Sequence, residues 1–258
     1  MATDAVTIVV VLICGPPASG KTTLALKLKQ KLDHCLLLSF DDIFSATEQE
    51  AAVKTKGHLK LLRRTMLEGV KNIIDGRTDT MEAKRIFDSI QLNAQGSKTW
   101  QYIIIDDNLY LRSMRYCWFQ AARTRSISLC NIYLATSLKR CLHHNRQRAS
   151  PVLEKVIVEQ FKKMEPPASR AHIAEKFTLT VNVPDDSEFA PVIKRAIEII
   201  SAAQLSPFSP QSTDNNTQEK KEKAEFSRSL TRASKSHNID LAFRRAISSL
   251  TKNGTMAT

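Results

Sequence analysis

The chain has 258 residues, 42% of them hydrophobic, and a formal net charge of +12 at pH 7. This length suits one α/β domain of about 200 residues with an added segment. No apolar run reaches the roughly 18 residues that a membrane span needs. The first residues, MATD, lack the basic start of a secretory signal, so a cytoplasmic protein is predicted. The basic balance suits a polyanionic partner such as nucleic acid, although charge alone does not identify one.

Apolar residues alternate between uninterrupted β-branched runs, typical of buried strands, and spacings typical of helices. In chain order the predicted elements are strand 6–14, a helix to about 32, strand 35–39, helices 59–73 and 79–94, strand 100–106, helix 112–123, strand 127–134, helices 138–148 and 151–163, strand 177–181 and helix 191–203. Strands that alternate with helices predict a parallel sheet with helices on both of its faces.

The composition changes after residue 204. Residues 205–237 are rich in Ser, Thr, Asn, Gln and Lys with few apolar residues, which predicts a disordered linker. Beyond it, residues 238–258 are expected to form a short basic amphipathic helix and a tail. The apolar residues of that helix are Ile239, Phe243, Ala246, Ile247 and Leu250.

The segment GPPASGKT joins the first strand to the first helix and matches G-x-x-x-x-G-K-[ST] at every fixed position. In this motif backbone N–H groups and the positive end of a helix bind phosphate. Lys21 is expected to reach the β- and γ-phosphates, and the Thr22 hydroxyl to bind Mg²⁺. The motif predicts a P-loop kinase domain over 1–204 that uses ATP and Mg²⁺. The predicted nucleotide-binding residues are Gly15, Pro16, Pro17, Ala18, Ser19, Gly20, Lys21, Thr22 and Thr23.

Acidic residues follow two predicted strands, at the sheet edge where α/β proteins bind ligands. After the second strand, the carboxylates of Asp41 and Asp42 have two possible roles: one can accept the proton of an attacking hydroxyl, and the other can cap a helix. We favour Asp42 as the catalytic base. Asp106 ends strand 100–106, a pattern typical of an aspartate that orients magnesium.

The predicted helix 138–148 is rich in basic residues, among them Arg140, His144, Arg146 and Arg148. In small P-loop kinases a basic helix at this place forms a lid, and its arginines neutralise charge on the transferring phosphoryl group. A solvated basic face is the alternative interpretation of the same residues.

Together these motifs resemble the L-seryl-tRNA(Sec) kinase family. The most specific part is DDNLY at 106–110 followed by SMRY at 113–116, and KMEP at 163–166 and FDD at 40–42 are also similar. The resemblance implies a P-loop kinase with a lid that converts seryl-tRNA(Sec) into O-phosphoseryl-tRNA(Sec), with the serine-charged selenocysteine tRNA as partner.

The resemblance also implies roles for single residues. Lys21 and Thr22 would serve the nucleotide and the metal, Asp42 would be the base, and Asp106 would lie near magnesium. Arg148 matches the second arginine of the R-x-x-x-R motif of the lid, whereas the first arginine of that motif falls on His144.

Other functions stay open at this point. One is an Elongator-associated type of P-loop ATPase in tRNA modification, which hydrolyses ATP without a small acceptor. Another is a kinase for a small metabolite, and a third is a binding protein that keeps the P-loop but has lost its lid. For a tRNA substrate, contacts to the RNA body are predicted from Lys60, Arg63, Arg64, Lys162, Lys163, Arg244 and Arg245.

Overall fold

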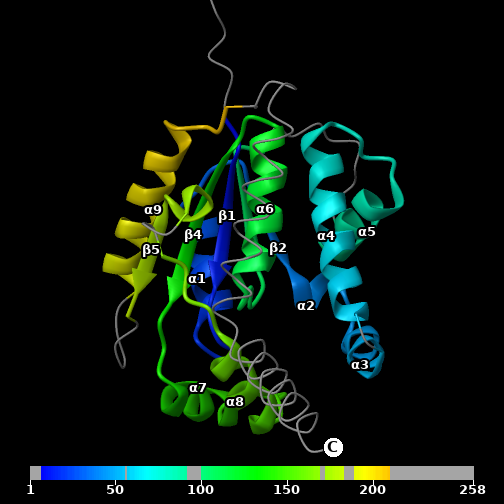
Figure 1. Cartoon of the computed structure of the whole chain (residues 1–258), viewed down its shortest axis with the longest axis vertical. Helices are drawn as coiled ribbons and strands as arrows, with labels where there is room; N and C mark the ends of the chain where they lie inside the picture. The colour runs from blue at the N-terminus through cyan, green and yellow to red at the C-terminus, as the bar shows by residue number, and fades with distance from the viewer. Residues whose placement is uncertain (1–6, 56, 92–99, 169–171, 183–188, 210–258) are drawn as a thin grey trace, which may run out of the picture. The chain divides into compact units, whose positions relative to one another are not determined.

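The computed structural model describes residues 7–55, 57–91, 100–168, 172–182 and 189–209. Within them, five strands form one parallel sheet in the order β2-β3-β1-β4-β5 (Figure 1). The strands are β1 Val9–Cys14, β2 Cys35–Ser39, β3 Tyr102–Asp106, β4 Ser128–Leu134 and β5 Thr178–Val181. The predicted fold class, a parallel sheet of the P-loop type with helices on both faces, is confirmed.

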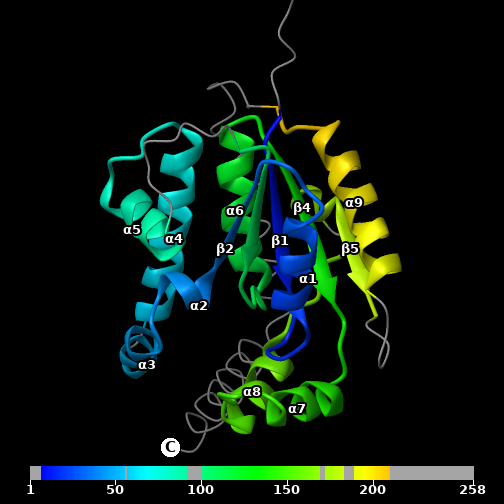
Figure 2. The same cartoon turned by 180° about the vertical axis from the view of Figure 1, so that it is seen from behind.

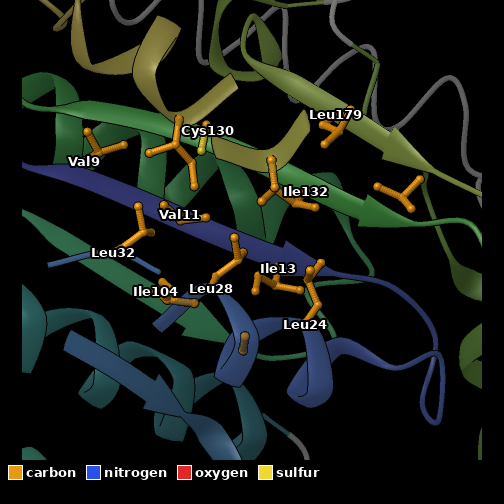
Figure 3. Close-up of a cluster of buried hydrophobic side chains, with 14 of the residues drawn as sticks. Val9, Val11, Ile13, Leu24, Leu28, Leu32, Ile104, Cys130, Ile132 and Leu179 are labelled. Atoms are coloured by element: carbon orange, nitrogen blue, oxygen red, sulfur yellow. The ribbon is translucent and has the colours of Figure 1, made fainter. Parts of the chain in front are cut away.

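Helices cover the two faces of this sheet. Helix α6, Arg112–Thr124, lies over one face in Figure 1, and the view from behind in Figure 2 shows α1, Lys21–Lys29, over the other. Helix α9, Ala190–Gln204, packs beside α1. Leu24 and Leu28 of α1 meet Val11 and Ile132 of the central strands in one buried cluster (Figure 3). Because β1 has helices on both faces, all six of its residues are buried, as its continuous apolar sequence predicts.

The register of the strands brings the predicted site residues to one edge. Ile13 of β1 is level with Asp106 of β3, and Ser39 of β2 is also level with Asp106. The P-loop, the segment after β2 and the end of β3 therefore meet at the carboxyl edge, where ligands of open α/β sheets bind.

Among the described residues between β2 and β3, four helices form a group beside the sheet, which we call the acceptor-side arm. They are α2 Phe40–Ile43, α3 Ala46–Lys54, α4 His58–Ile74 and α5 Met81–Ser89. Helices α4 and α5 were expected, although α5 ends earlier than predicted, whereas α2 and α3 were not expected. A signal for α3 was present, since Ser45 and Glu48 form a reciprocal capping box.

Two further helices, α7 Leu138–Arg146 and α8 Glu154–Lys163, lie beyond the carboxyl ends of the strands (Figure 1) and form the expected helical lid. Buried Asn145 closes the turn between them, because its Nδ2 donates to Val152 O at 2.7 Å and its Oδ1 accepts from Val152 N at 2.9 Å. A short 3-10 helix, η1 Ile173–Glu175, precedes β5.

The predicted linker and terminal helix lie, from residue 210 onward, outside the described residues. In the part of the chain that the structure describes, no helix is long and apolar enough to cross a membrane.

Candidate active site

The P-loop connects β1 to α1 with an unusual backbone path. Ala18 and Gly20 have positive φ values of 60° and 96°, and such a value is easily adopted only by glycine. A Cβ atom on Gly15 would lie 3.0 Å from Leu134 O and 3.0 Å from Ser19 Oγ. The glycines of the motif are therefore required by the tight path of the loop against β4.

Lys21 is the first residue of α1 and is only 8% exposed. Its Nζ donates to Pro16 O at 2.7 Å and to Gly15 O at 3.2 Å, so the side chain folds back over the loop. Burial lowers the pKa of Lys21, although the charges of Asp106 and Asp107 oppose that shift. An anion beside this ammonium group would stabilise its charged form.

Thr22 and Asp106 come together across 84 residues of sequence, as the motifs predict. Thr22 Oγ1 donates to Asp106 Oδ2 at 2.6 Å. Asp106 is 5% exposed, and burial raises its pKa, against the hydrogen bond from Thr22 and the charge of Lys21, while Asp41 adds to the rise. A cation placed here would favour the ionised carboxylate.

These residues fit a bound nucleotide with magnesium. The N-terminus of α1 has no side-chain cap, so its backbone N–H groups are available to phosphate. Ser19 Oγ is buried without a hydrogen-bond partner among the described residues. No group of three or more His, Cys, Asp or Glu side chains in that part of the chain could bind a metal by itself. Magnesium would therefore use Thr22, Asp106, phosphate oxygens and water, the hard oxygen ligands that it prefers.

Asp41 and Asp42 both lie in α2, at the end of β2 and exposed to solvent. Neither caps the helix from outside, because the N-cap residue is Ser39. Asp41 Oδ1 accepts from Gln49 Nε2 at 3.1 Å, and the charge of Asp41 contributes to the raised pKa of Asp106. The assignment of Asp42 as the base stays a prediction, and Asp41 is a direct competitor for that role.

The end of β3 carries a second buried carboxylate, Asp107, whose partner was not predicted. Arg63 of α4 binds it with both arms of its guanidinium group, Nε to Oδ2 at 2.7 Å and Nη2 to Oδ1 at 3.1 Å. The next residue, Asn108, accepts a hydrogen bond from Gly15 N at its carbonyl oxygen, at 3.1 Å, and donates from Nδ2 to Gln160 Oε1 of α8 at 2.9 Å. This loop therefore contacts the P-loop, the acceptor-side arm and the lid.

Arg115 supports the same loop from α6. Its Nη1 donates to Leu109 O at 2.9 Å, and its Nη2 donates to Glu175 Oε1 at 2.7 Å and to Glu165 O at 2.9 Å. Leu109 has a φ of 42°, a rare backbone conformation for a bulky residue. The buried arginine thus stabilises the path that leaves β3. Its place in the SMRY motif was the available signal, although the motif alone gave it no role.

The lid arranges its basic residues unequally. His144 Nδ1 lies 3.3 Å from Ala18 O of the P-loop, and Arg140 Nε donates to His144 Nε2 at 3.4 Å. The neutral tautomer with its proton on Nδ1 satisfies both contacts. Arg146 turns away and pairs with Glu154 at 2.7 Å on the exposed surface. Arg148 follows α7, and its side chain is exposed. In the part of the chain that the structure describes, His144 thus contacts the P-loop, whereas the Arg148 side chain forms no hydrogen bond or ion pair with it.

Known proteins resemble this chain along most of its length. Residues 8–257 match the family described as "Chromatin associated protein KTI12". The L-seryl-tRNA(Sec) kinase of Homo sapiens is 27% identical over 207 residues, which are 67% of this chain and 60% of the human protein. The mouse protein of the same name is 24% identical, over 92% of this chain and 74% of its own length. The sequence resemblance to L-seryl-tRNA(Sec) kinases is thus confirmed, although this chain covers less than two thirds of the human protein.

The fold also matches solved structures. A sugar kinase from Janibacter sp. HTCC2649 superposes with a TM-score of 0.53 at 14% identity, over 77% of this chain and 97% of the other. At that identity the likeness concerns the fold alone, which is the fold of P-loop kinases.

Proposed function

The chain belongs to the family described as chromatin associated protein KTI12, and within this family we propose that it is an ATP-dependent kinase acting on seryl-tRNA(Sec). The reaction would pass the γ-phosphoryl group to the seryl hydroxyl, giving O-phosphoseryl-tRNA(Sec). The observation that carries the proposal is the DDNLY–SMRY segment, which marks the resemblance to these kinases. Here DDNLY forms the loop that contacts the P-loop, the arm and the lid, and SMRY supplies Arg115, which supports this loop from α6. Two relatives named as such kinases support it.

The nucleotide half of the reaction rests on Lys21, Thr22 and Asp106. The Lys21 ammonium group would leave the carbonyls of Gly15 and Pro16 for phosphate oxygens, since it is buried within the loop that binds them. Thr22 and Asp106 would bind magnesium through the two oxygens that are now 2.6 Å apart. When bound, magnesium neutralises charge on the phosphates and orients them.

The acceptor half requires a base and a cation. A carboxylate of α2, Asp42 in our assignment, would take the proton of the seryl hydroxyl as its oxygen attacks phosphorus and the bond to the departing ADP breaks. Arg148 would approach the equatorial oxygens when the lid moves over the site. His144, which holds the position of the first lid arginine, already contacts the P-loop, and Arg140 beside it is the candidate for the missing charge.

A second candidate function is ATP hydrolysis without a small acceptor, as in the Elongator-associated type of ATPase. The observation that favours it is His144 at the place of the first lid arginine, because an imidazole lacks the planar fork of donors with which arginine binds phosphoryl oxygens. Such an enzyme would release phosphate from ATP and leave seryl-tRNA unmodified.

The experiment that separates these functions uses [γ-³²P]ATP, magnesium and two acceptors, seryl-tRNA(Sec) and seryl-tRNA(Ser). We expect the label as phosphoserine on the selenocysteine tRNA alone. Labelled free phosphate without phosphoserine would favour the ATPase. Equal phosphorylation of both tRNAs would contradict selection of the selenocysteine tRNA.

A further inference from the structure

Helix α4 carries three basic residues near its start, Lys60, Arg63 and Arg64, which the sequence assigns together to RNA binding. The structure separates them. Lys60 and Arg64 are exposed, whereas Arg63 faces the catalytic edge and binds Asp107, with side chains 17% and 4% exposed. A planar guanidinium fork with both arms on one carboxylate is a geometric fit that lysine does not offer. Arg63 is therefore committed to the site and not to the outer surface of α4.

The contacts around the ion pair connect the acceptor-side arm to the P-loop. The Arg63 guanidinium group lies 4.9 Å from the ring centroid of Phe40, the residue that begins α2 and precedes both candidate bases. On the other side, Asp107 Oδ1 accepts from Asn108 N at 2.7 Å, and Asn108 O accepts from Gly15 N at 3.1 Å. Four consecutive contacts thus lead from α2 through Arg63 to the first residue of the nucleotide loop.

The Arg63–Asp107 ion pair also affects the charge balance at the end of β3. Asp106 and Asp107 are adjacent in sequence, and both carboxylates are buried at the end of β3. Arg63 balances Asp107, so that Asp106 is the carboxylate left to meet a metal. The guanidinium group of an arginine is not deprotonated in proteins, so this cation is permanent.

A second bidentate pair at the other end of α4 provides a comparison inside the same helix. Arg125, which follows α6, binds Asp75 through Nε and Nη2, both at 2.7 Å. Asp75 is the C-cap of α4, roughly 18 Å along the helix from Arg63 at 1.5 Å per residue. Both pairs attach α4 to the body of the protein, but Arg63 alone does so at the catalytic edge.

We propose that Arg63 is a positioning residue: through Asp107 it sets the acceptor-side arm against the loop 106–108, so that the acceptor hydroxyl lies in line with the phosphoryl group. This role rests on the proposed kinase function. A displacement of about 1 Å at a reacting centre can cost on the order of 10²-fold in rate, so the link needs no contact with substrate to matter.

The kinetic test compares Arg63→Gln, Arg63→Lys and Asp107→Asn with the double variant Arg63→Gln/Asp107→Asn and the control Arg125→Gln. We expect Arg63→Gln to lower kcat by about 10²-fold while Kd for ATP stays within about twofold, and Arg63→Lys to recover part of kcat. Because the two residues act as a unit, kcat of the double variant should be no lower than kcat of the less active single variant. Arg125→Gln should lower Tm and leave kcat unchanged.

Two results would overturn the role. Equal loss of kcat in Arg63→Gln and Arg125→Gln would mean that either pair merely holds the fold together. An unchanged kcat in Arg63→Gln, with a raised KM for tRNA and a flatter salt dependence, would return Arg63 to the RNA-binding residues.

An experiment that needs no acceptor substrate separates this proposal from the proposed function. If the wild-type protein phosphorylates no seryl-tRNA, the kinase assignment fails, but amide hydrogen exchange still reports the link. Arg63→Gln should speed exchange both at 58–64 and at 106–110, whereas Arg125→Gln should leave 106–110 unchanged. Unaltered exchange at 106–110 in Arg63→Gln would show that the pair does not support the catalytic edge.

Discussion

The nucleotide edge and the lid both carry the charges that phosphoryl transfer needs, but they hold them differently. At the nucleotide edge, Lys21 and Asp106 are 8% and 5% exposed and have fixed partners. On the lid, Arg146 is paired with Glu154, at side-chain exposures of 66% and 47%. Arg148 is exposed as well.

The difference teaches where the structure is preorganised. Buried groups at strand ends are positioned before any ligand arrives, since neighbours on both sides fix their rotamers. An exposed ion pair contributes about 1 kcal/mol or less, so the lid can exchange its present contacts for others at low cost. The nucleotide edge is therefore expected to bind, and the lid to complete the site only when a substrate is present.

At the nucleotide edge, the largest effect is expected for Lys21→Ala. We expect phosphoryl transfer to fall by about 10⁴-fold, because this cation meets the phosphates of both ground state and transition state. Lys21 bonds only to carbonyls of its own loop, so Tm should change little. Transfer rate and thermal unfolding are measured together, with Lys29→Ala, exposed on the same helix, as control. Activity within about tenfold of wild type would remove Lys21 from the site.

The lid is tested by Arg148→Ala, which we expect to lower kcat on the order of 10³-fold, as loss of an arginine at a transferring phosphoryl group can. ATP affinity should stay near wild type, because among the described residues the exposed Arg148 side chain forms no hydrogen bond or ion pair with the P-loop. Arg146→Ala is the matched control, since its partner is Glu154. His144→Arg should raise kcat or leave it unharmed. An unchanged kcat in Arg148→Ala would mean that the basic residues of this helix form only a solvated face.

The two aspartates of α2 sharpen the comparison from the acceptor side. Asp42→Asn keeps the size of the side chain but removes the proton acceptor, and we expect about 10²-fold lower kcat at unchanged ATP affinity. We expect an effect at the lower end of those known for general bases, because a loose transition state needs little proton transfer to the base. Asp41→Asn is measured in parallel. If it is the more damaging change, the roles of the two residues are reversed.

The sequence predicted that the P-loop, Thr22 and Asp106 would meet at one sheet edge, and the structure places them there, because the signals for them are local. A continuous apolar run, a glycine-rich loop and an aspartate at a strand end each lie within a few residues, and the parallel topology brings them together. The acceptor-side arm was predicted less well. Arg63 lies 44 residues from Asp107, and a lysine-arginine cluster on a helix does not reveal which member turns inward.

The same reasoning applies to the lid. His144 was predicted from its motif position as a departure from R-x-x-x-R, but its contact with Ala18 depends on how α7 meets the P-loop across 126 residues of sequence. The short helices α2 and α3 were missed because their apolar residues are too few for a helical period, although the capping box at Ser45 was readable.

The smallest expected effect concerns RNA binding by the outer face of the lid. The active site meets the same seryl ester on every seryl-tRNA, so discrimination must come from the tRNA body, which is recognised largely through phosphate and 2′-OH contacts. Lys162 and Lys163 end α8 and are exposed, whereas Arg244 and Arg245, also predicted to contact RNA, lie outside the described residues. Lys162→Ala/Lys163→Ala should weaken tRNA affinity by about tenfold in all and flatten the salt dependence by about one unit of slope for each lysine. ATP binding should be unaffected.

The measurement is tRNA affinity across a salt series, with Lys27→Ala/Lys29→Ala on α1 as control. Equal slopes for both double variants would exclude the end of α8 from the RNA-binding surface, and recognition would then have to lie elsewhere on the chain.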